Sequence, residues 1–252
     1  MLCHAPQAAR GMRIYRHTIS AGRGGTGEIK VWGPRAIATV LWEVGSQFEL
    51  LTGHQLDIDS ALADSYVKRL NSAERFDVFI GVSALVDALI KDGKIVADSR
   101  TPLVRSWIGV EVRAGAPRPD IGSVEAFKRT LLAAESIAYL NVGGGVHIAA
   151  MIERLGLANA LRSKVTRPDT DIVSELVANG DVELGMVITA QILTTTGVQF
   201  VGPLPPPLQS DVAFVGGVSG DTKVPGAARE LLGFLRGPAA AAVIKSQGME
   251  LS

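Results

Sequence analysis

Four segments of the sequence place glycine, arginine, hydroxyl or amide groups where a predicted strand leads into a predicted helix. The first amides of a helix have no partner within it and lie at the positive end of its dipole, so such junctions bind small anions without needing a basic side chain. Several junctions that meet at one cleft hold an anion from more than one side. The segments are Gly33–Ala36, Ala61–Ser65, Asn141–His147 and Ile188–Gln191.

The first junction, Gly33-Pro34-Arg35-Ala36, contains a cation and no hydroxyl group. The planar guanidinium of Arg35 matches the two oxygens of a carboxylate, which favours an organic acid as the ligand. A solvated or structural arginine is the alternative, and the sequence leaves both open. We expect Gly33, Pro34, Arg35 and Ala36 to contribute to a ligand site.

The second junction contributes Ala63, Asp64 and Ser65. The Ser65 hydroxyl can donate a hydrogen bond to a ligand, whereas Asp64 is more simply the N-cap of the helix that follows. If Asp64 faces the cleft in its ionised form, it repels a fully charged oxyanion at close range. A protonated or cationic feature in the ligand would then be needed.

The third junction, Asn141-Val-Gly-Gly-Gly-Val-His147, follows a predicted strand and opens a predicted helix. There the amides of Gly143, Gly144 and Gly145 can approach an anion closely, although three glycines also make an ordinary flexible turn. The imidazole of His147 can donate to a carboxylate or exchange a proton with it. A partly buried histidine bonded to the backbone is the alternative.

The fourth junction offers Thr189 and Gln191, which follow a buried predicted strand. Both side chains can donate hydrogen bonds to an anion, and both residue types are also common at helix starts for capping alone. We include them among the ligand-binding candidates.

These junctions depend on an alternation of strands and helices that begins at Glu28. Strands are predicted over 29–32, 55–58 and 78–82, and helices over 36–52, 65–70 and 83–90. The first of these helices has apolar residues at helical spacing and is closed by Gly53. Repeated units of this kind predict an α/β fold whose largely parallel sheet is covered on both faces.

A second set of units follows an extended stretch over 103–113 and the break Gly115-Ala-Pro-Arg-Pro119. Ser123 is a good N-cap for a helix over 124–133. Further helices are predicted over 146–155 and 171–179, with strands over 137–140, 184–188 and 198–201. After the prolines of 203–207 the chain becomes extended again over 212–218 and ends in helices over 226–235 and 239–247.

The two extended stretches predict two lobes joined by two crossing strands, with a ligand cleft between the lobes. We expect lobe 1 to comprise residues 29–106 plus 211–252 and lobe 2 to comprise residues 107–210, after an irregular N-terminal extension of residues 1–28. The first 27 residues contain four arginines, no acidic residue and no apolar core of an export signal. Their G-x-G-x-x-G spacing precedes the first strand, so we attribute it to chance rather than to dinucleotide binding.

Composition excludes several classes of protein. The 252 residues include 25 basic and 25 acidic side chains, so no strongly basic face is expected for nucleic acid. The single cysteine excludes a disulfide framework and a thiolate zinc site. No G-x-S-x-G, Walker or H-E-x-x-H motif is present, and no apolar run reaches the ~18 residues of a bilayer span. We expect no metal and no cofactor.

Several longer runs resemble molybdate-binding proteins of ABC importers. They are Phe76–Gly81 with Leu85–Ile95, Ala149–Gly156, Glu183–Val187 and Phe234–Met249, which occur in the order that this family uses. The resemblance extends over about residues 29–249. It implies a type II periplasmic-binding-protein fold, a small anionic ligand held by amides and hydroxyls at helix N-termini, and a transporter membrane component as partner.

The chain departs from the family at two of the four junctions. The family usually has a serine or another small donor at the first, where this chain has Gly33-Pro34-Arg35-Ala36. Molybdate binders commonly have a tyrosine close to the position of Ile188. The resemblance therefore supports the scaffold better than the molybdate pocket, and we expect a small organic carboxylate or, failing that, a molybdate-like oxyanion.

Three functions follow from these observations. The leading one is a monomeric solute-binding protein that captures a small anion for ABC-type uptake. The first alternative is an enzyme similar to aconitate isomerase, which is related to this family and moves a proton, with Asp64 or His147 as the candidate base and Arg35 as a clamp. The second is a ligand sensor in the cytoplasm. The resemblance implies a periplasmic protein, whereas the missing signal core leaves a cytoplasmic one open.

Overall fold

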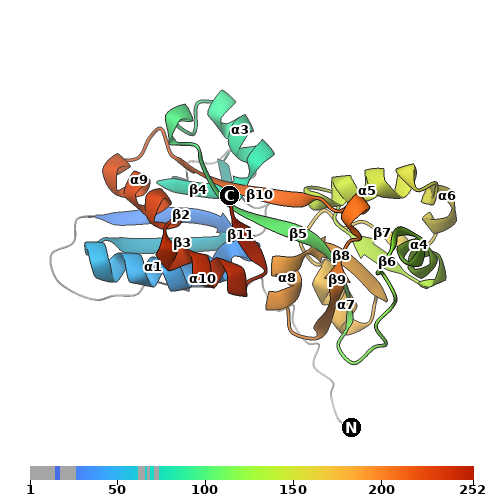
Figure 1. The fold of residues 1–252 in the computed structure, drawn as a ribbon. Helices are drawn as coiled ribbons and strands as arrows, with labels where there is room; N and C mark the ends of the chain where they lie inside the picture. Colours follow the sequence, from blue (N-terminus) through green and yellow to red (C-terminus); the bar gives the residue numbers. More distant parts are fainter. Residues whose placement is uncertain (1–14, 18–26, 62–65, 67–68, 71–73) are drawn as a thin grey trace, which may run out of the picture.

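A computed structural model of the chain describes residues 15–17, 27–61, 66, 69–70 and 74–252. These residues fold into two α/β lobes that are joined by two long strands, as Figure 1 shows. Strands of both lobes belong to one curled sheet, in which the order of the main path is β1-β3-β2-β4-β10-β5-β8-β6-β7. The alternation of strands and helices predicted from the sequence is therefore confirmed as an α/β fold.

Lobe 1 is built around three parallel strands. Strand β2 (Glu28–Pro34) lies in the middle and pairs in parallel with both β3 (Gln55–Ala61) and β4 (Val78–Val82). Its helices are η1 (Arg35–Ile37), α1 (Ala38–Thr52), α3 (Ser83–Lys91), η2 (Ala97–Ser99), α9 (Pro225–Phe234) and α10 (Pro238–Ser246). Helix α1 ends at Gly53, whose φ of 75° is a left-handed conformation that glycine adopts without strain.

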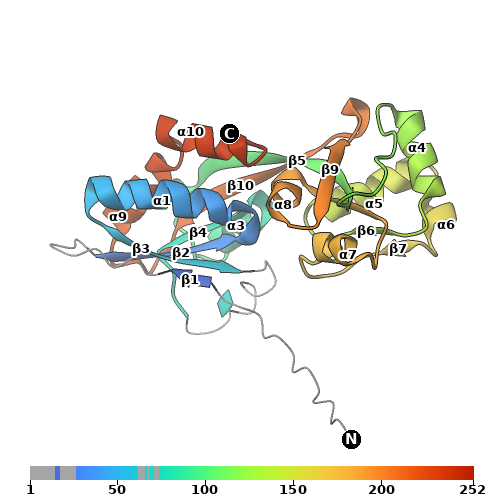
Figure 2. The same ribbon diagram turned by 90° about the horizontal axis from the view of Figure 1, so that it is seen from below.

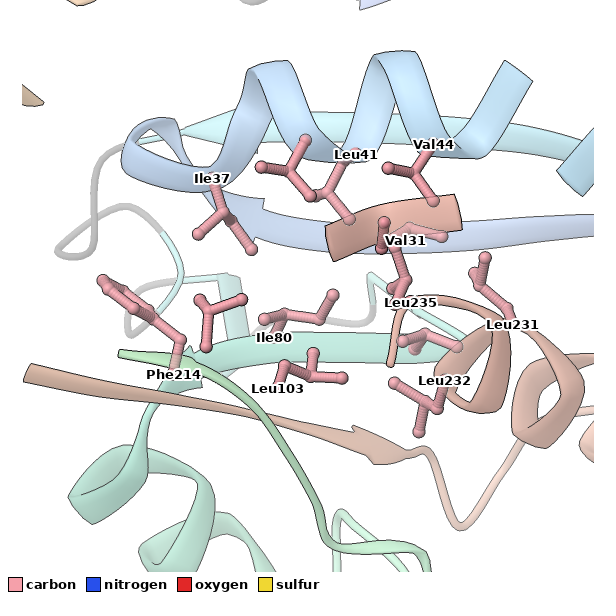
Figure 3. Packing of buried hydrophobic residues seen from close by; sticks show 14 of the residues in the cluster. Val31, Ile37, Leu41, Val44, Ile80, Leu103, Phe214, Leu231, Leu232 and Leu235 are labelled. Carbon is pink, nitrogen blue, oxygen red and sulfur yellow. The ribbon is translucent and has the colours of Figure 1, made fainter. Parts of the chain in front are cut away.

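Alternating side chains of the lobe 1 strands enter two apolar layers. Val31 and Ile80 point to the face covered by α1, α9 and α10, whereas Trp32 and Phe79 point to the face covered by α3. Figure 3 shows Leu41 and Val44 of α1 directed at Val31, with leucines at the end of α9 completing the layer. The two-residue repeat of the strands and the turn-by-turn repeat of the helices thus produce a sheet with both faces buried.

The N-terminal segment differs from the irregular extension that the sequence suggested. Tyr15–His17 forms strand β1 and pairs antiparallel with β3, in the register Tyr15 to Ser60. The other described partner of β3 is β2. A strand added here covers the edge of the sheet that β3 would otherwise leave unpaired.

Lobe 2 repeats the plan around β6 (Ile137–Tyr139), β7 (Val165–Thr166), β8 (Leu184–Ile188) and β9 (Val198–Pro203). One face packs against α4 (Val124–Ala133), α5 (Gly144–Arg154) and α6 (Ala158–Leu161). The other packs against α7 (Val173–Asn179) and α8 (Thr189–Thr194). The predicted N-cap Ser123 is confirmed, because its hydroxyl accepts a hydrogen bond of 3.1 Å from the amide of Ala126.

Two long antiparallel strands cross between the lobes. Strand β5 (Thr101–Arg113) pairs with β10 (Asp211–Val218) and β11 (Met249–Leu251) along its first half, and with β8 and β9 along its second half. The pairing of β5 changes between Trp107 and Ile108. In Figure 2 both crossing strands run across the gap between the two sets of helices.

The fourth junction leads into helix α8, whose extent was not predicted because six residues are too few to show a helical repeat. It belongs to lobe 2 in the chain, yet Ala190 at its start packs into the apolar core of lobe 1, and α8 contacts η1. The first junction of lobe 1 and the fourth junction of lobe 2 are therefore neighbours in space.

Helix α1 provides a matched test of the core. Leu41 is 3% exposed within the lobe 1 core, whereas Leu50 on the same helix is 85% exposed. We expect Leu41→Ala to lower the free energy of unfolding by about 2–5 kcal/mol through lost burial and a cavity, and Leu50→Ala to change it by less than about 0.5 kcal/mol. Urea unfolding followed by circular dichroism measures both. Equal effects of the two substitutions would contradict this packing.

Candidate ligand site between the lobes

A cavity of about 270 Å³ lies where the two lobes and the crossing strands meet. Four strands end at it: β2 and β4 of lobe 1, and β6 and β8 of lobe 2. Ligands of open α/β sheets bind at such carboxyl ends, where the loops to the next helices converge. The lining residues are Pro34, Arg35, Ala36, Val82, Leu85, Ile108, Leu140, Val142, Gly143, Gly144, Gly145, Ile148, Asp171, Met186, Val187, Ile188, Gln191, Val212 and Phe214.

Helix α5 presents its N-terminus to this cavity through the three glycines. Gly143 has a φ of 56°, and a Cβ on Gly145 would lie 1.7 Å from the Leu140 carbonyl oxygen, so both positions require glycine. The amide of Gly145 donates to the Val142 carbonyl within this turn. In the described part of the chain the amides of Gly143 and Gly144 have no backbone acceptor, which leaves them as donors for an anion.

Arg35 is the cation among the described residues that line the cavity. It lies in η1 of lobe 1, and its Nη2 is 2.8 Å from Oε1 of Glu175, which lies in α7 of lobe 2. The side chains of the pair are 44% and 40% exposed, so the ion pair contributes little to stability. A ligand carboxylate can therefore compete with Glu175 for the guanidinium at low cost.

Asp171 and Gln191 add a carboxylate and an amide from lobe 2. Asp171 lies two residues before the start of α7, and Gln191 lies in α8 and is 5% exposed. The pKa of the Asp171 carboxyl is raised to about 6, and burial is the largest cause. The charge of Arg35 and the Gln191 amide act to lower this pKa, whereas the charge of Glu175 adds to the rise. Within the described residues, Oδ1 of Asp171 and Nε2 of Gln191 are buried and make no hydrogen bond of normal geometry.

A second carboxyl group lies behind the cavity, in the core of lobe 2. Glu111 of β5 is fully buried, and the Ser174 hydroxyl of α7 lies 2.8 Å from its Oε1. Burial raises the pKa of Glu111 to about 7; the Ser174 hydrogen bond opposes this, and the nearby Glu175 and Asp171 add to it. Three carboxyl groups thus gather around α7, with Arg35 as the cation that lowers the pKa of Asp171 and pairs with Glu175.

The structure brings together some of the residues that the sequence singled out and separates others. Pro34, Arg35, Ala36, Gln191 and the three glycines line the cavity. Gly33 does not, because its carbonyl accepts the hydroxyl hydrogen bond of Tyr66 behind the junction. Ala63, Asp64 and Ser65 lie outside the described residues.

His147 and Thr189 are placed away from this cavity. An imidazole nitrogen of His147 lies 3.0 Å from the Leu208 carbonyl oxygen, which is the structural alternative considered for this histidine. The Thr189 hydroxyl donates to the Trp107 carbonyl, and the residue lines a separate hollow beside β11. Each side chain is held by a backbone carbonyl of the neighbouring segment rather than turned toward the lobe interface.

Sequence reasoning missed Asp171 as a site residue. The motif Pro168-Asp-Thr-Asp171 before a predicted helix is typical of an N-cap, and the sequence has no signal that separates a cap from a cleft residue. Only the packing of α7 beside α8 and η1 brings Asp171 to the cavity.

Neither a metal site nor a membrane segment is found among the residues that the structure describes. No group of three or more histidine, cysteine or acidic side chains there has an arrangement that could hold a metal ion. None of the described helices combines the length and the apolar character needed to cross a bilayer.

Two lobes, two crossing strands and a cavity between the lobes define the fold of type II periplasmic binding proteins. A search of known structures agrees, because the periplasmic molybdate-binding protein of Azotobacter vinelandii superimposes with a TM-score of 0.72 at 21% identity, over 89% of this chain and 99% of that one. The chain belongs to the family of bacterial extracellular solute-binding proteins, whose sequence model matches residues 29–250. The predicted family resemblance is thereby confirmed.

Two curated relatives differ in what they do. An aconitate isomerase from Pseudomonas sp is 32% identical over 214 residues, which is 82% of each chain. The molybdate-binding protein ModA of Azotobacter vinelandii is 28% identical over 221 residues, or 83% of this chain and 84% of the relative. The family thus includes similar chains named for an enzyme and for a binding protein.

The buried Glu111 predicts a pH dependence of stability. Its pKa of about 7 in the fold lies above the ordinary 4.5, so the folded chain binds more protons than the unfolded chain between these values. We expect the free energy of unfolding to fall by up to about 3 kcal/mol as the pH rises from about 4.5 to about 7.

Glu111→Gln keeps a polar partner for Ser174 and cannot ionise, so its stability relative to the natural chain should rise across this pH window. Urea unfolding at a series of pH values measures the difference, and Glu43→Gln, an exposed position on α1, is the control. Parallel pH profiles for the natural chain and Glu111→Gln would show that Glu111 is not responsible.

Proposed function

We propose that the protein captures a small organic carboxylate in the cavity between its lobes, as the solute-binding component of an ABC-type importer. The observation that carries the proposal is the lining of the cavity. Apart from Arg35, Asp171 and Gln191, each described lining residue is glycine or has an apolar side chain. Such walls suit the carbon skeleton of an organic ligand, and the guanidinium suits its carboxylate.

A tetrahedral dianion such as molybdate fits this lining less well. None of the described lining side chains has a hydroxyl group, so an oxyanion would rely on glycine amides, one amide side chain and one arginine. Asp171 lies in the same cavity and repels a dianion when it is ionised, in a site where little water screens the charges. A carboxylate with a single negative charge avoids most of that repulsion.

Family membership supports the transport role. The chain belongs to a family of extracellular solute-binding proteins, and the relative ModA is named for binding rather than for catalysis. We therefore propose the periplasm as the place where the protein works and a transporter membrane component as its partner.

A second candidate function, isomerisation of aconitate, is favoured by the relative of that name and by Asp171. Moving the double bond of aconitate requires a base that removes a proton from the saturated carbon next to the double bond. The proton is then returned to the far carbon of the original double bond, with no net gain or loss of atoms. The pKa of about 6 held by Asp171 suits both steps near neutral pH. For an isomerase we therefore propose Asp171 as the base, in place of Asp64 or His147, which the sequence suggested.

Arg35 tests the binding function. Arg35→Ala removes a charge-assisted pair of hydrogen bonds worth about 1.5–3 kcal/mol, so we expect it to weaken carboxylate binding about ten- to a hundredfold. Calorimetry with isocaproate, succinate, citrate, cis- and trans-aconitate, molybdate and sulfate measures the affinities.

Arg229→Ala is the matched control, because Arg229 of α9 also forms an ion pair at 2.7 Å and is 45% exposed, and it does not line the cavity. It should leave the affinities unchanged. Micromolar binding of molybdate with no binding of any carboxylate, and no effect of Arg35→Ala, would refute the proposed ligand class.

The isomerase candidate is tested by following the conversion of cis- to trans-aconitate by proton NMR in heavy water. A positioned base contributes about 10²–10⁴-fold to such a step, so Asp171→Asn should lower any turnover by at least about 10²-fold, whereas Asp181→Asn at the other end of α7 should not. If the natural chain binds aconitate without converting it, the isomerase function is excluded and the carboxylate-binding function is retained.

A further inference from the structure

Two buried polar atoms of residues that line the cavity make no hydrogen bond of normal geometry within the described part of the chain. They are Oδ1 of Asp171 and Nε2 of Gln191, and the Gln191 residue is 5% exposed. Leaving a buried polar group without a partner costs free energy, and native structures contain few such groups. The Gln191 amide acts on the Asp171 carboxyl and lowers its pKa, but the contact between them falls short of a normal hydrogen bond. Because both residues also line the cavity, a bound ligand can partner both atoms.

The two atoms require opposite chemistry from that ligand. Nε2 of Gln191 is a donor, and together with Arg35 and the amides of Gly143 and Gly144 it calls for an acceptor such as a carboxylate. Oδ1 of an ionised Asp171 only accepts, so it calls for a donor. A ligand made only of acceptors leaves Asp171 unpaired and places negative charge against it.

The position of Asp171 favours a donor close to the ligand carboxylate. Arg35 and Asp171 line the same cavity, and Glu175, which pairs with Arg35 at 2.8 Å, lies four residues after Asp171 in the chain. The guanidinium charge also lowers the pKa of the Asp171 carboxyl. A carboxylate at Arg35 would then bind in the part of the cavity that Asp171 lines, and we place the donor on the carbon next to it.

We infer that the ligand is a carboxylate with a hydroxyl or ammonium group on the adjacent carbon, whose donor Asp171 accepts while Arg35 and Gln191 hold the carboxylate. This inference rests on the proposed function and narrows its ligand class. The apolar walls formed by Val82, Leu85 and Met186, among others, are left for the remaining carbon skeleton.

Ligands that differ only at the adjacent carbon test the inference. One set is 2-hydroxyisocaproate, leucine and isocaproate, and a second is malate, aspartate and succinate. Binding is measured by calorimetry at about pH 8, above the Asp171 pKa of about 6, so that this carboxyl is ionised. We expect the hydroxylated or the aminated member of at least one set to bind about tenfold or more tightly than the unsubstituted member.

Variants of Asp171 assign that preference. Asp171→Leu removes the acceptor and should bring the members of a set to within about twofold of one another. Asp171→Asn keeps an acceptor without the charge, so it should retain part of a preference for hydroxyl and lose a preference for ammonium. Asp181→Leu, an exposed position beyond the far end of α7, is the control and should leave the preference unchanged. Thermal unfolding confirms that each variant is folded.

The outcomes separate this inference from the proposed function. If the members of each set bind equally well to the natural chain, or if Asp171→Leu keeps the preference, the inference is overturned while carboxylate capture stands. If no carboxylate binds, the proposed function fails and the inference fails with it.

Discussion

The hydrogen bonding of one long strand, β5, to partners in two lobes is the constraint on which the rest of the structure depends. Its first half is tied to β10 and β11, and its second half to β8 and β9. Because this pairing holds the lobes side by side, the carboxyl ends of β2, β4, β6 and β8 meet at one cavity. Loops from distant parts of the chain are then brought together as a ligand site.

The electrostatics of the cavity follow from where η1 of lobe 1 meets the start of α7. Arg35 lies in η1 and pairs with Glu175 of α7; Asp171 lies two residues before α7, and the buried Glu111 lies behind them. Among the described residues, Arg35 thus interacts with two carboxyl groups, and a further negative charge close to them is costly. The ligand class that we propose follows from this balance of charges.

The same arrangement in this chain is chemically compatible with binding and with catalysis. A carboxylate held close to a ligand accepts a hydrogen bond when the ligand presents a hydroxyl or ammonium group, and it removes a proton when the ligand presents an acidic carbon–hydrogen bond. Asp171 has the position and the raised pKa for either role. Fold membership alone does not decide between them, because function is set by the chemistry of a site and not by its scaffold.

The sequence by itself determined the elements of this protein and the loops between them. Strand repeats such as 78–82 and 184–188, the N-cap Ser123 and the break at Gly53 are local signals, and the structure has them at those residues. The sequence also indicated Arg35 and the three glycines as candidate site residues, because residue type and position between a strand and a helix are local properties. Their roles toward a ligand remain predictions.

Only the tertiary structure decided which junctions face one another and which polar groups are left without partners. His147 and Asp171 both follow a strand or open a helix in the sequence, yet the Leu208 carbonyl holds the first away from the cavity and packing beside Arg35 brings the second to it. These contacts join residues 61 and more than 100 positions apart along the chain. No local pattern encodes them, because they arise from the pairing of β5, from the packing of α8 into the core of lobe 1 and from the ion pair between Arg35 and Glu175 of α7.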